Sequence, residues 1–224
     1  MDVISGSRRV QRGKTALAAL ISIILLSGCF FQTPPRVEPR PAAWAEHIPS
    51  QHLKNWHKLD EDVYRSEQPG RKGFIEIRDR GIKTVVNLRS HHSDDSKAAD
   101  LGLVLVRVPM TAAGFSEADI VAALKAIQSS AKPVLIHCQR GADRAGVVSA
   151  MYRVVFQDWS REEAIAELKG GGFGFASHYK HIPEFIREVD VEKIRKELGL
   201  RPPVSAGYFF SPAMAALISR TRTS

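Results

Sequence analysis

The pattern of hydrophobic and polar residues predicts strands and helices that alternate along the chain. Short apolar runs indicate buried strands at residues 63–65, 82–88, 103–108 and 134–137. Helical spacing and end signals indicate helices at residues 72–80, 96–101, 117–129 and 147–156, another capped by Ser160, and one that begins at Pro183. Alternating strands and helices predict an α/β fold: a single three-layer domain with a central, mostly parallel sheet flanked by helices.

The N-terminus does not continue this pattern. Four basic residues precede an apolar run at residues 16–26, which is short for a membrane span and typical of a secretory signal peptide. The run ends in Leu26-Ser27-Gly28-Cys29, which resembles a bacterial lipobox, and the resemblance implies a lipid on Cys29. An uncleaved anchor and a non-lipidated signal peptide are the alternatives. We expect a lipid-anchored protein of the bacterial cell envelope that faces the periplasm, with the outer membrane as one location.

These observations divide the chain into four segments. Residues 1–28 are the signal peptide, and residues 29–57, which contain five prolines, form a tether. Residues 58–200 form the domain, and residues 201–224 are a C-terminal extension whose structure the sequence does not predict. Two tryptophans of the tether, Trp44 and Trp56, are expected to dock on the domain, with the lipid interface as the alternative.

Charge and cysteine content narrow the chemistry. Part of the formal net charge of +8 belongs to the basic N-terminus, and the rest is spread out. This distribution fits anionic substrates or a membrane surface better than nucleic acid, which we do not expect as a partner. The two cysteines are Cys29 and Cys138, so the thiol of the domain has no partner for an internal disulfide. One cysteine gives no thiolate cluster, and we expect neither a metal nor a cofactor.

The eight residues from His137 to Arg144 carry the chemistry. They connect an apolar strand to a helix, and such a turn directs backbone N–H groups and the helix dipole into one concavity that suits a phosphate. Cys138, at the start of the turn, lies near these donors and near a guanidinium, which favours its thiolate. The sequence therefore predicts a phosphate cradle with a nucleophile, as in a cysteine-dependent phosphatase.

This loop, with five residues between Cys138 and Arg144, resembles the signature of the protein tyrosine phosphatase superfamily. Residues 58–200 resemble its small dual-specificity branch, most closely at residues 63–69, 81–89, 103–110 and 167–174. A thiolate at Cys138 would attack phosphorus to form a phosphocysteine, and Arg144 would hold two phosphate oxygens. The phosphate-binding residues would be Gln139, Arg140, Gly141, Ala142, Asp143 and Arg144.

Other residues would support the loop. Gly141 is where the loop most needs positive φ or a close backbone approach. His137 is expected to brace the loop by hydrogen bonding. Arg65 and Arg89 lie near strand ends and either reach the phosphate or brace the loop.

The chain departs from the family pattern in two places. Ala145 stands where the family has Ser or Thr, a hydroxyl that helps the phosphocysteine to hydrolyse, so the second step is expected to be slow. No carboxylate occupies residues 111–116, where relatives carry the general acid, and Glu117 and Asp119 fit the first turn of a helix better. We predict Asp143 as the acid, with loop bracing as the alternative role. Asp94 and Asp95 are the next candidates.

The predicted function is that of a phosphomonoesterase that acts through a phosphocysteine at the cell envelope. Its substrates would be phosphorylated proteins, as for a tyrosine or dual-specificity phosphatase, or phospholipids and inositol phosphates. A catalytically impaired phosphatase fold that only binds phosphate is the alternative. A sulfurtransferase is disfavoured, because its loop is usually one residue shorter, and a redox protein because the chain lacks a resolving cysteine.

Overall fold

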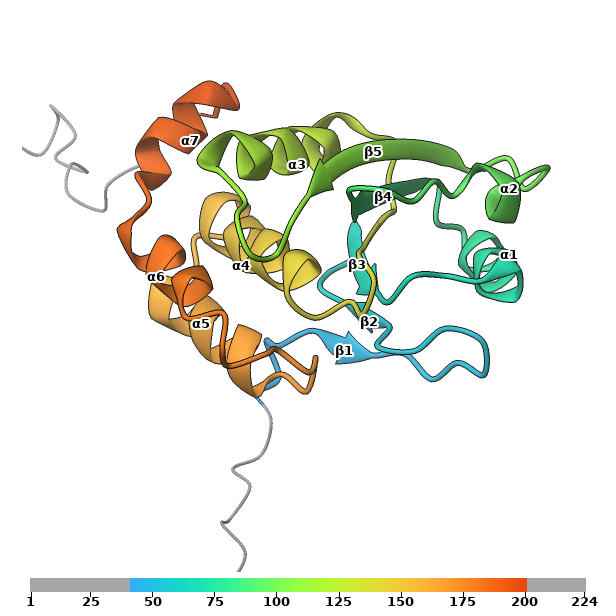
Figure 1. Ribbon diagram of the computed structural model, residues 1–224, viewed down its shortest axis with the longest axis horizontal. Helices are drawn as coiled ribbons and strands as arrows, with labels where there is room; N and C mark the ends of the chain where they lie inside the picture. The colour runs from blue at the N-terminus through green and yellow to red at the C-terminus, as the bar shows by residue number, and fades with distance from the viewer. Residues whose placement is uncertain (1–40, 201–224) are drawn as a thin grey trace, which may run out of the picture. The chain divides into compact units, whose positions relative to one another are not determined.

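The structure is a computed structural model that describes residues 41–200 (Figure 1). The described residues form a six-stranded sheet in the order β1-β2-β3-β6-β4-β5. The strands are β1 (Glu46–His47), β2 (His57–Lys58), β3 (Val63–Ser66), β4 (Thr84–Arg89), β5 (Val104–Met110) and β6 (Val134–His137). The helices are α1 (Arg71–Asp79), α2 (Asp95–Ala98), α3 (Glu117–Ser129), α4 (Arg144–Phe156), α5 (Arg161–Gly170), α6 (His181–Glu188) and α7 (Val191–Glu197).

The sheet is mixed and mostly parallel, which confirms the predicted fold class. Strands β3, β6, β4 and β5 run parallel to one another, whereas β1 and β2 pair antiparallel at the edge next to β3. In the parallel part, Ser66 and Asn87 flank His137, the last residue of the central strand β6. Because the carboxyl ends of parallel strands meet at one edge, β6 delivers the following residue, Cys138, to the edge where such folds place their sites.

Helices cover both faces of the sheet and produce two cores. Alternate residues of each strand face opposite sides, so Val85 and Leu135 enter the core on the side of α1, whereas Val86 and Ile136 enter the larger core on the side of α3 to α7. Figure 1 shows α1 and α2 on one side of the sheet and α3, α4 and α5 on the other. This arrangement is the predicted three-layer domain.

The domain begins earlier than the predicted residue 58. Residues 41–57, which we assigned to the tether, contribute β1, the connection from β1 to β2 and the first residue of β2. Their buried side chains include Ala45, Leu53 and Trp56. Trp56 is 0% exposed, so it docks on the domain as expected. Strands of two residues are too short to show a periodic pattern, and the prolines made the segment resemble a linker. Residues 1–40 and 201–224, with the predicted signal peptide, Cys29 and the C-terminal extension, lie outside the described residues.

The predicted elements recur with small shifts at their ends. The helix expected at residues 117–129 and the strand at 134–137 are confirmed as α3 and β6. Helix α4 begins at Arg144 instead of residue 147, helix α6 begins two residues before Pro183, and α7 was not predicted. Between residues 41 and 200, the structure has no helix that is long and apolar enough to cross a bilayer.

Candidate active site

The predicted phosphate loop lies between the end of β6 and the start of α4. Cys138 directly follows β6 and is 2% exposed, and Arg144 is the first residue of α4. The loop leads directly into the N-terminus of this 13-residue helix. The free N–H groups of the first turn and the positive end of the helix dipole therefore face the loop. The structure thus places a thiol at the floor of a turn that is built to receive an anion.

Gly141 allows this turn to close. Its φ is +70°, and a Cβ atom at this position would lie 2.5 Å from the carbonyl carbon and 2.6 Å from the carbonyl oxygen of Ser66. A side chain would therefore meet backbone atoms of β3 that cannot move aside without displacing the sheet. The glycine predicted to need positive φ or a close approach needs both.

Arg65 holds the outer side of the loop. Its guanidinium donates to the carbonyl oxygens of Gly141 at 2.6 Å and of Ala142 at 3.2 Å, and it stacks on the ring of Phe173 at 3.8 Å. Burial lowers the pKa of Arg65 to about 10, which leaves it charged at neutral pH. Because the C=O and N–H of a peptide point in opposite directions, this clamp leaves the loop N–H groups for the inner side. Of its two possible roles, Arg65 is placed as a brace.

Arg144 and Arg89 supply further positive charge at the site. Arg144 donates to the carbonyl oxygen of Met110 at 3.4 Å, and Arg89, at the end of β4, donates to Oε1 of Gln68 at 3.2 Å. Burial and the nearby charge of Arg144 lower the pKa of Arg89, whereas Cys138 and Asp94 favour its charged form. Arg89 is thus close enough to Arg144 and to the Cys138 thiol for their charges to act on it.

His137 is buried and contacts the loop, as expected of a bracing residue. Its Nδ1 lies 3.2 Å from the carbonyl oxygen of Cys138, and its Nε2 lies 2.8 Å from Oδ2 of Asp94. Asp94 also accepts a hydrogen bond from Nε2 of Gln68 at 2.7 Å. Burial alone would raise the pKa of Asp94, but the hydrogen bonds from His137 and Gln68 outweigh it and lower this pKa. The sequence signalled Asp94 only as an acid candidate; its contact with His137 is visible only in the fold.

Asp143 is buried and uses both carboxylate oxygens. One accepts from the guanidinium of Arg140 at 2.6 Å, and the other accepts from the backbone N–H of Ala176 at 2.9 Å. Asn55 completes this corner by donating to the carbonyl oxygens of Arg140 and Phe173. These contacts tie the phosphate loop to residues 173–176, so the geometry matches the bracing role that the sequence left open for Asp143.

The remaining acid candidates are engaged elsewhere. Asp95 is exposed and accepts from Oγ of Ser93, and Glu117 pairs with Lys193 at 2.7 Å. Asp119 forms a capping box with Ser116 at the start of α3, as its sequence position predicted. In the loop where relatives carry the acid, Nε2 of His181 contacts the carbonyl oxygen of Ala112 at 2.8 Å. In the sequence, His181 reads as an ordinary surface or groove residue, with a position near the substrate as the alternative.

Ala145 is fully buried in the first turn of α4, beside Arg144. Oγ of Ser149, one turn further along α4, donates to the carbonyl oxygen of Ala145 at 2.7 Å.

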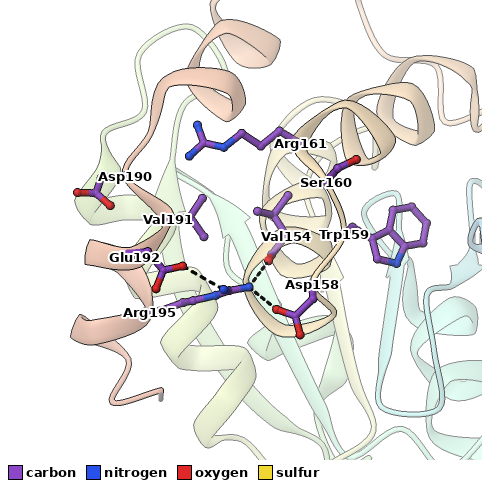
Figure 2. A pocket seen from close by; sticks show the side chains of 9 residues that line it. All are labelled: Val154, Asp158, Trp159, Ser160, Arg161, Asp190, Val191, Glu192 and Arg195. Carbon is purple, nitrogen blue, oxygen red and sulfur yellow. Dashed lines mark hydrogen bonds and ion pairs between the residues drawn. The ribbon is translucent and has the colours of Figure 1, made fainter. Parts of the chain in front are cut away.

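A separate hollow of about 570 Å³ lies at the other end of α4 (Figure 2). One side of it is lined by Arg195, which donates to the carbonyl oxygen of Val154 at 2.9 Å and pairs with Asp158 and Glu192. These charges satisfy one another and the C-terminal carbonyls of α4, so the hollow is a packing feature of α7. Among the described residues, no group of three His, Cys, Asp or Glu side chains could hold a metal ion.

Comparison with known proteins decides the family. The family model described as polymorphic toxin system, DSP-PTPase phosphatase, matches residues 61–157. The dual specificity protein phosphatase TpbA of Pseudomonas aeruginosa (strain UCBPP-PA14) is 33% identical over 185 residues, which are 80% of this chain and 81% of TpbA. This chain belongs to the dual-specificity protein phosphatase family. It is a cysteine-dependent phosphatase, as the loop predicted.

Solved structures agree with this assignment. The crystal structure of P. aeruginosa TpbA superimposes with a TM-score of 0.65 at 27% identity, over 71% of this chain and 99% of TpbA. A cysteine-to-serine variant of TpbA in complex with phosphotyrosine has the same TM-score at 26% identity, over 71% and 98%. The catalytic core of the PP-IP phosphatase Siw14 from S. cerevisiae has a TM-score of 0.59 at 24% identity, over 69% and 97%, and shares the fold.

Proposed function

We propose that this phosphatase hydrolyses phosphomonoesters through a phosphocysteine on Cys138. The observation that carries the proposal is the position of this thiol, which lies at the floor of a turn shaped by Gly141 and Arg65, with Arg144 and the N-terminus of α4 beside it. In the first step Sγ attacks phosphorus, the bond to the leaving oxygen breaks, and that oxygen takes a proton. In the second step water attacks phosphorus, the S–P bond breaks, and phosphate leaves with the thiolate restored.

Arg144 and the loop N–H groups perform the electrostatic part of this reaction. A planar guanidinium can hold two equatorial oxygens of the phosphoryl group, and peptide N–H groups can hold the others. The loop N–H groups are held in place before substrate arrives, because Arg65 binds the loop carbonyls and Asp143 ties the loop to Ala176. The guanidinium of Arg144 donates to the carbonyl oxygen of Met110 at 3.4 Å. The charge that develops in the transition state therefore meets donors that need not reorganise.

Phosphorylated protein, with phosphotyrosine first, is the substrate class we propose. The support comes from TpbA, which is described as a dual-specificity protein phosphatase and was solved in a variant form with phosphotyrosine. Phospholipids and inositol phosphates are the second substrate class, motivated by the predicted lipid anchor at Cys29 and the acidic residue within the loop. We place the enzyme at the bacterial cell envelope, facing the periplasm, on the evidence of the N-terminal pattern alone.

A phosphate-binding module without turnover is the second candidate function. Two observations favour it: Ala145 provides no hydroxyl beside the thiol, and both oxygens of Asp143 already accept hydrogen bonds. Such a module would capture phosphorylated ligands and release them unchanged.

Phosphate release under reducing conditions separates these functions. The chain from residue 41 onward is incubated with p-nitrophenyl phosphate, with phosphopeptides that carry phosphotyrosine or phosphoserine, and with phosphoinositide vesicles. The Cys138→Ser variant is the matched control. Release that requires Cys138 supports the enzyme, and the relative kcat/KM values rank the substrate classes. Tight phosphopeptide binding by both proteins without release would favour the binding module instead.

A further inference from the structure

A buried series of hydrogen bonds connects the residues after β4 with the peptide of the nucleophile. Asp94 and His137 are 3% and 0% exposed, and Oδ2 of Asp94 lies 2.8 Å from Nε2 of the imidazole. The other ring nitrogen, Nδ1, lies 3.2 Å from the carbonyl oxygen of Cys138. Gln68 donates to the second oxygen of Asp94 through its side chain and to the carbonyl oxygen of Gln139 through its backbone. The carboxylate of Asp94 is thus connected to the phosphate loop by hydrogen bonds through His137 and through Gln68.

The partners of the imidazole determine where its protons lie. A carbonyl oxygen only accepts, so the contact with Cys138 requires a proton on Nδ1. An ionised carboxylate also only accepts, so the contact with Asp94 requires a proton on Nε2. The His137 contact itself favours ionisation of Asp94 by lowering the pKa of that carboxyl against the effect of burial. Both contacts are hydrogen bonds at the same time only when both ring nitrogens carry protons.

We propose that Asp94 is a positioning residue of this phosphatase, whose carboxylate keeps His137 protonated on both ring nitrogens so that the ring holds the Cys138 carbonyl. The imidazolium then places a positive charge one residue from the nucleophile and fixes the first peptide of the phosphate loop. The effect on turnover rests on the proposed function, whereas the protonation of the ring is a property of the folded protein and is measured separately.

The charged surroundings explain why the ring needs an anion. Arginines lie on β3, at the end of β4 and at the start of α4, and nearby cations disfavour the charged form of a buried imidazole unless a carboxylate offsets them. Asp94 is the carboxylate that contacts the ring among the described residues. The titratable and charged groups around the pair are Arg65 on β3, Arg89 at the end of β4, His92 in the loop before α2, Cys138 in the phosphate loop, and Arg144 on α4.

Nitrogen-15 NMR of histidine-labelled protein tests the protonation directly. The full chain carries Cys29→Ser so that Cys138 is its only thiol, and the His137→Gln variant identifies the signals of His137. We expect both ring nitrogens of His137 to be protonated at pH 7. A ring that is singly protonated at pH 7 in this otherwise unchanged protein would show that the proposal is wrong, whatever the variants do.

Two substitutions separate charge from position. Asp94→Asn keeps an amide that can donate to Nε2 of a neutral ring, so it removes the charge and retains the geometry, whereas Asp94→Ala removes both. Asp95→Asn is the matched control, since Asp95 is the next residue and is exposed. We expect Asp94→Asn to convert His137 to its Nδ1–H tautomer and to slow alkylation of Cys138 by iodoacetamide at pH 6 by about tenfold, with little change at pH 9. Asp95→Asn should match the parent protein.

Turnover provides the last comparison. For p-nitrophenyl phosphate, we expect Asp94→Asn to move the acidic limb of the kcat/KM profile to higher pH without loss of the folded state. A rate loss that is equal at every pH would indicate a purely structural role and overturn the proposal. If the parent protein releases no phosphate while its His137 is doubly protonated, the proposed function fails and the protonation by Asp94 stands.

Discussion

At the scale of single residues, Gly141 and Arg65 decide the shape of the phosphate loop from two sides. Gly141 lets the loop approach the backbone of β3, and Arg65 holds the carbonyls that this approach turns outward. Neither residue needs to touch substrate to be essential. Their effect is to fix the N–H donors before an anion arrives, which is where most of the electrostatic stabilisation of such a site comes from.

Gly141→Ala should abolish activity and lower stability by more than the cost of positive φ alone, which is about 1–2 kcal/mol. The added Cβ would lie 2.5 Å from backbone of Ser66, so the loop must move. Gly174→Ala is the control, because Gly174 also has positive φ (+73°) but has nothing within 4 Å of its Cβ position. Urea unfolding and phosphate release measure the two effects. Equal losses of stability in both variants would contradict the backbone clash.

Substrates with different leaving groups distinguish the two possible roles of Asp143. If Asp143 braces the loop through Arg140 and Ala176, Asp143→Asn should slow p-nitrophenyl phosphate and an alkyl phosphate by similar factors. If it protonates the leaving oxygen, only the alkyl phosphate should slow strongly, because nitrophenolate leaves without a proton. From the geometry we expect similar factors, on the order of ten or more. Steady-state rates for both substrates decide between the roles.

Ala145 is expected to make hydrolysis of the phosphocysteine the slow step. Ala145→Thr should then raise the steady-state rate several-fold and shrink the pre-steady-state burst of nitrophenol. Because Ala145 is fully buried, Ala145→Ser provides the hydroxyl with less added volume and controls for overpacking. Rapid-quench kinetics of the parent and both variants measure burst and steady state together. An unchanged burst and rate in a folded serine variant would exclude this explanation.

At the scale of elements, a buried ion pair joins the helices behind the site. Arg153 on α4 pairs with Glu167 on α5 at 2.8 Å, with each side chain 3% exposed, and Glu167 also accepts the backbone N–H of Ala45 at 2.6 Å. Arg153 in turn donates to the carbonyl oxygens of Leu59 and Ala43. One pair therefore connects α4, α5 and the N-terminal segment of the domain.

Glu167→Gln should destabilise the fold by about 3–5 kcal/mol, because it leaves the Arg153 guanidinium buried without an anion. Glu162→Gln is the control: Glu162 pairs with Arg187 on the surface, where an ion pair contributes about 1 kcal/mol or less. Equilibrium unfolding in urea gives both values. Similar small losses in the two variants would mean that water or another group replaces the buried carboxylate.

At the scale of the whole molecule, the domain depends on its N-terminal segment. Residues 41–57 place Ile48, Leu53 and Trp56 in the core on the side of α1, and the guanidinium of Arg80 lies 4.9 Å from the Trp56 ring. They also supply Asn55, which bridges the phosphate loop and the residues that follow α5. The segment predicted as a tether is thus part of both core and site.

A protein that begins at residue 41 should fold, whereas one that begins at residue 58 should be insoluble or melt far lower. Replacement of a buried tryptophan by alanine leaves a cavity and lowers the free energy of unfolding by about 3–5 kcal/mol. Trp56→Ala in the longer protein is the milder companion variant. Thermal unfolding followed by circular dichroism compares the three proteins. A protein from residue 58 that is as stable as the longer one would restore the boundary that the sequence suggested.

The sequence by itself determined the parallel part of the sheet, the helices α1, α3, α4 and α5, and the phosphate loop. These features are local: period-two and period-3.6 patterns, caps and the spacing of Cys138 and Arg144 all lie within short windows. The family followed from the same loop. The need for glycine at position 141 was also local, because a tight turn before a helix has few backbone solutions.

Only the tertiary structure decided which polar residues meet at the loop. Asp94 and His137 are 43 residues apart, and Asn55 and Arg140 are 85 apart, so no local window contains both partners. The structure also turned Asp143 toward Arg140 and Ala176 and drew residues 41–57 into the core. A carboxylate has the same sequence signal whether it donates a proton, braces a loop or fixes an imidazole. Its role depends on which partners surround it in the fold.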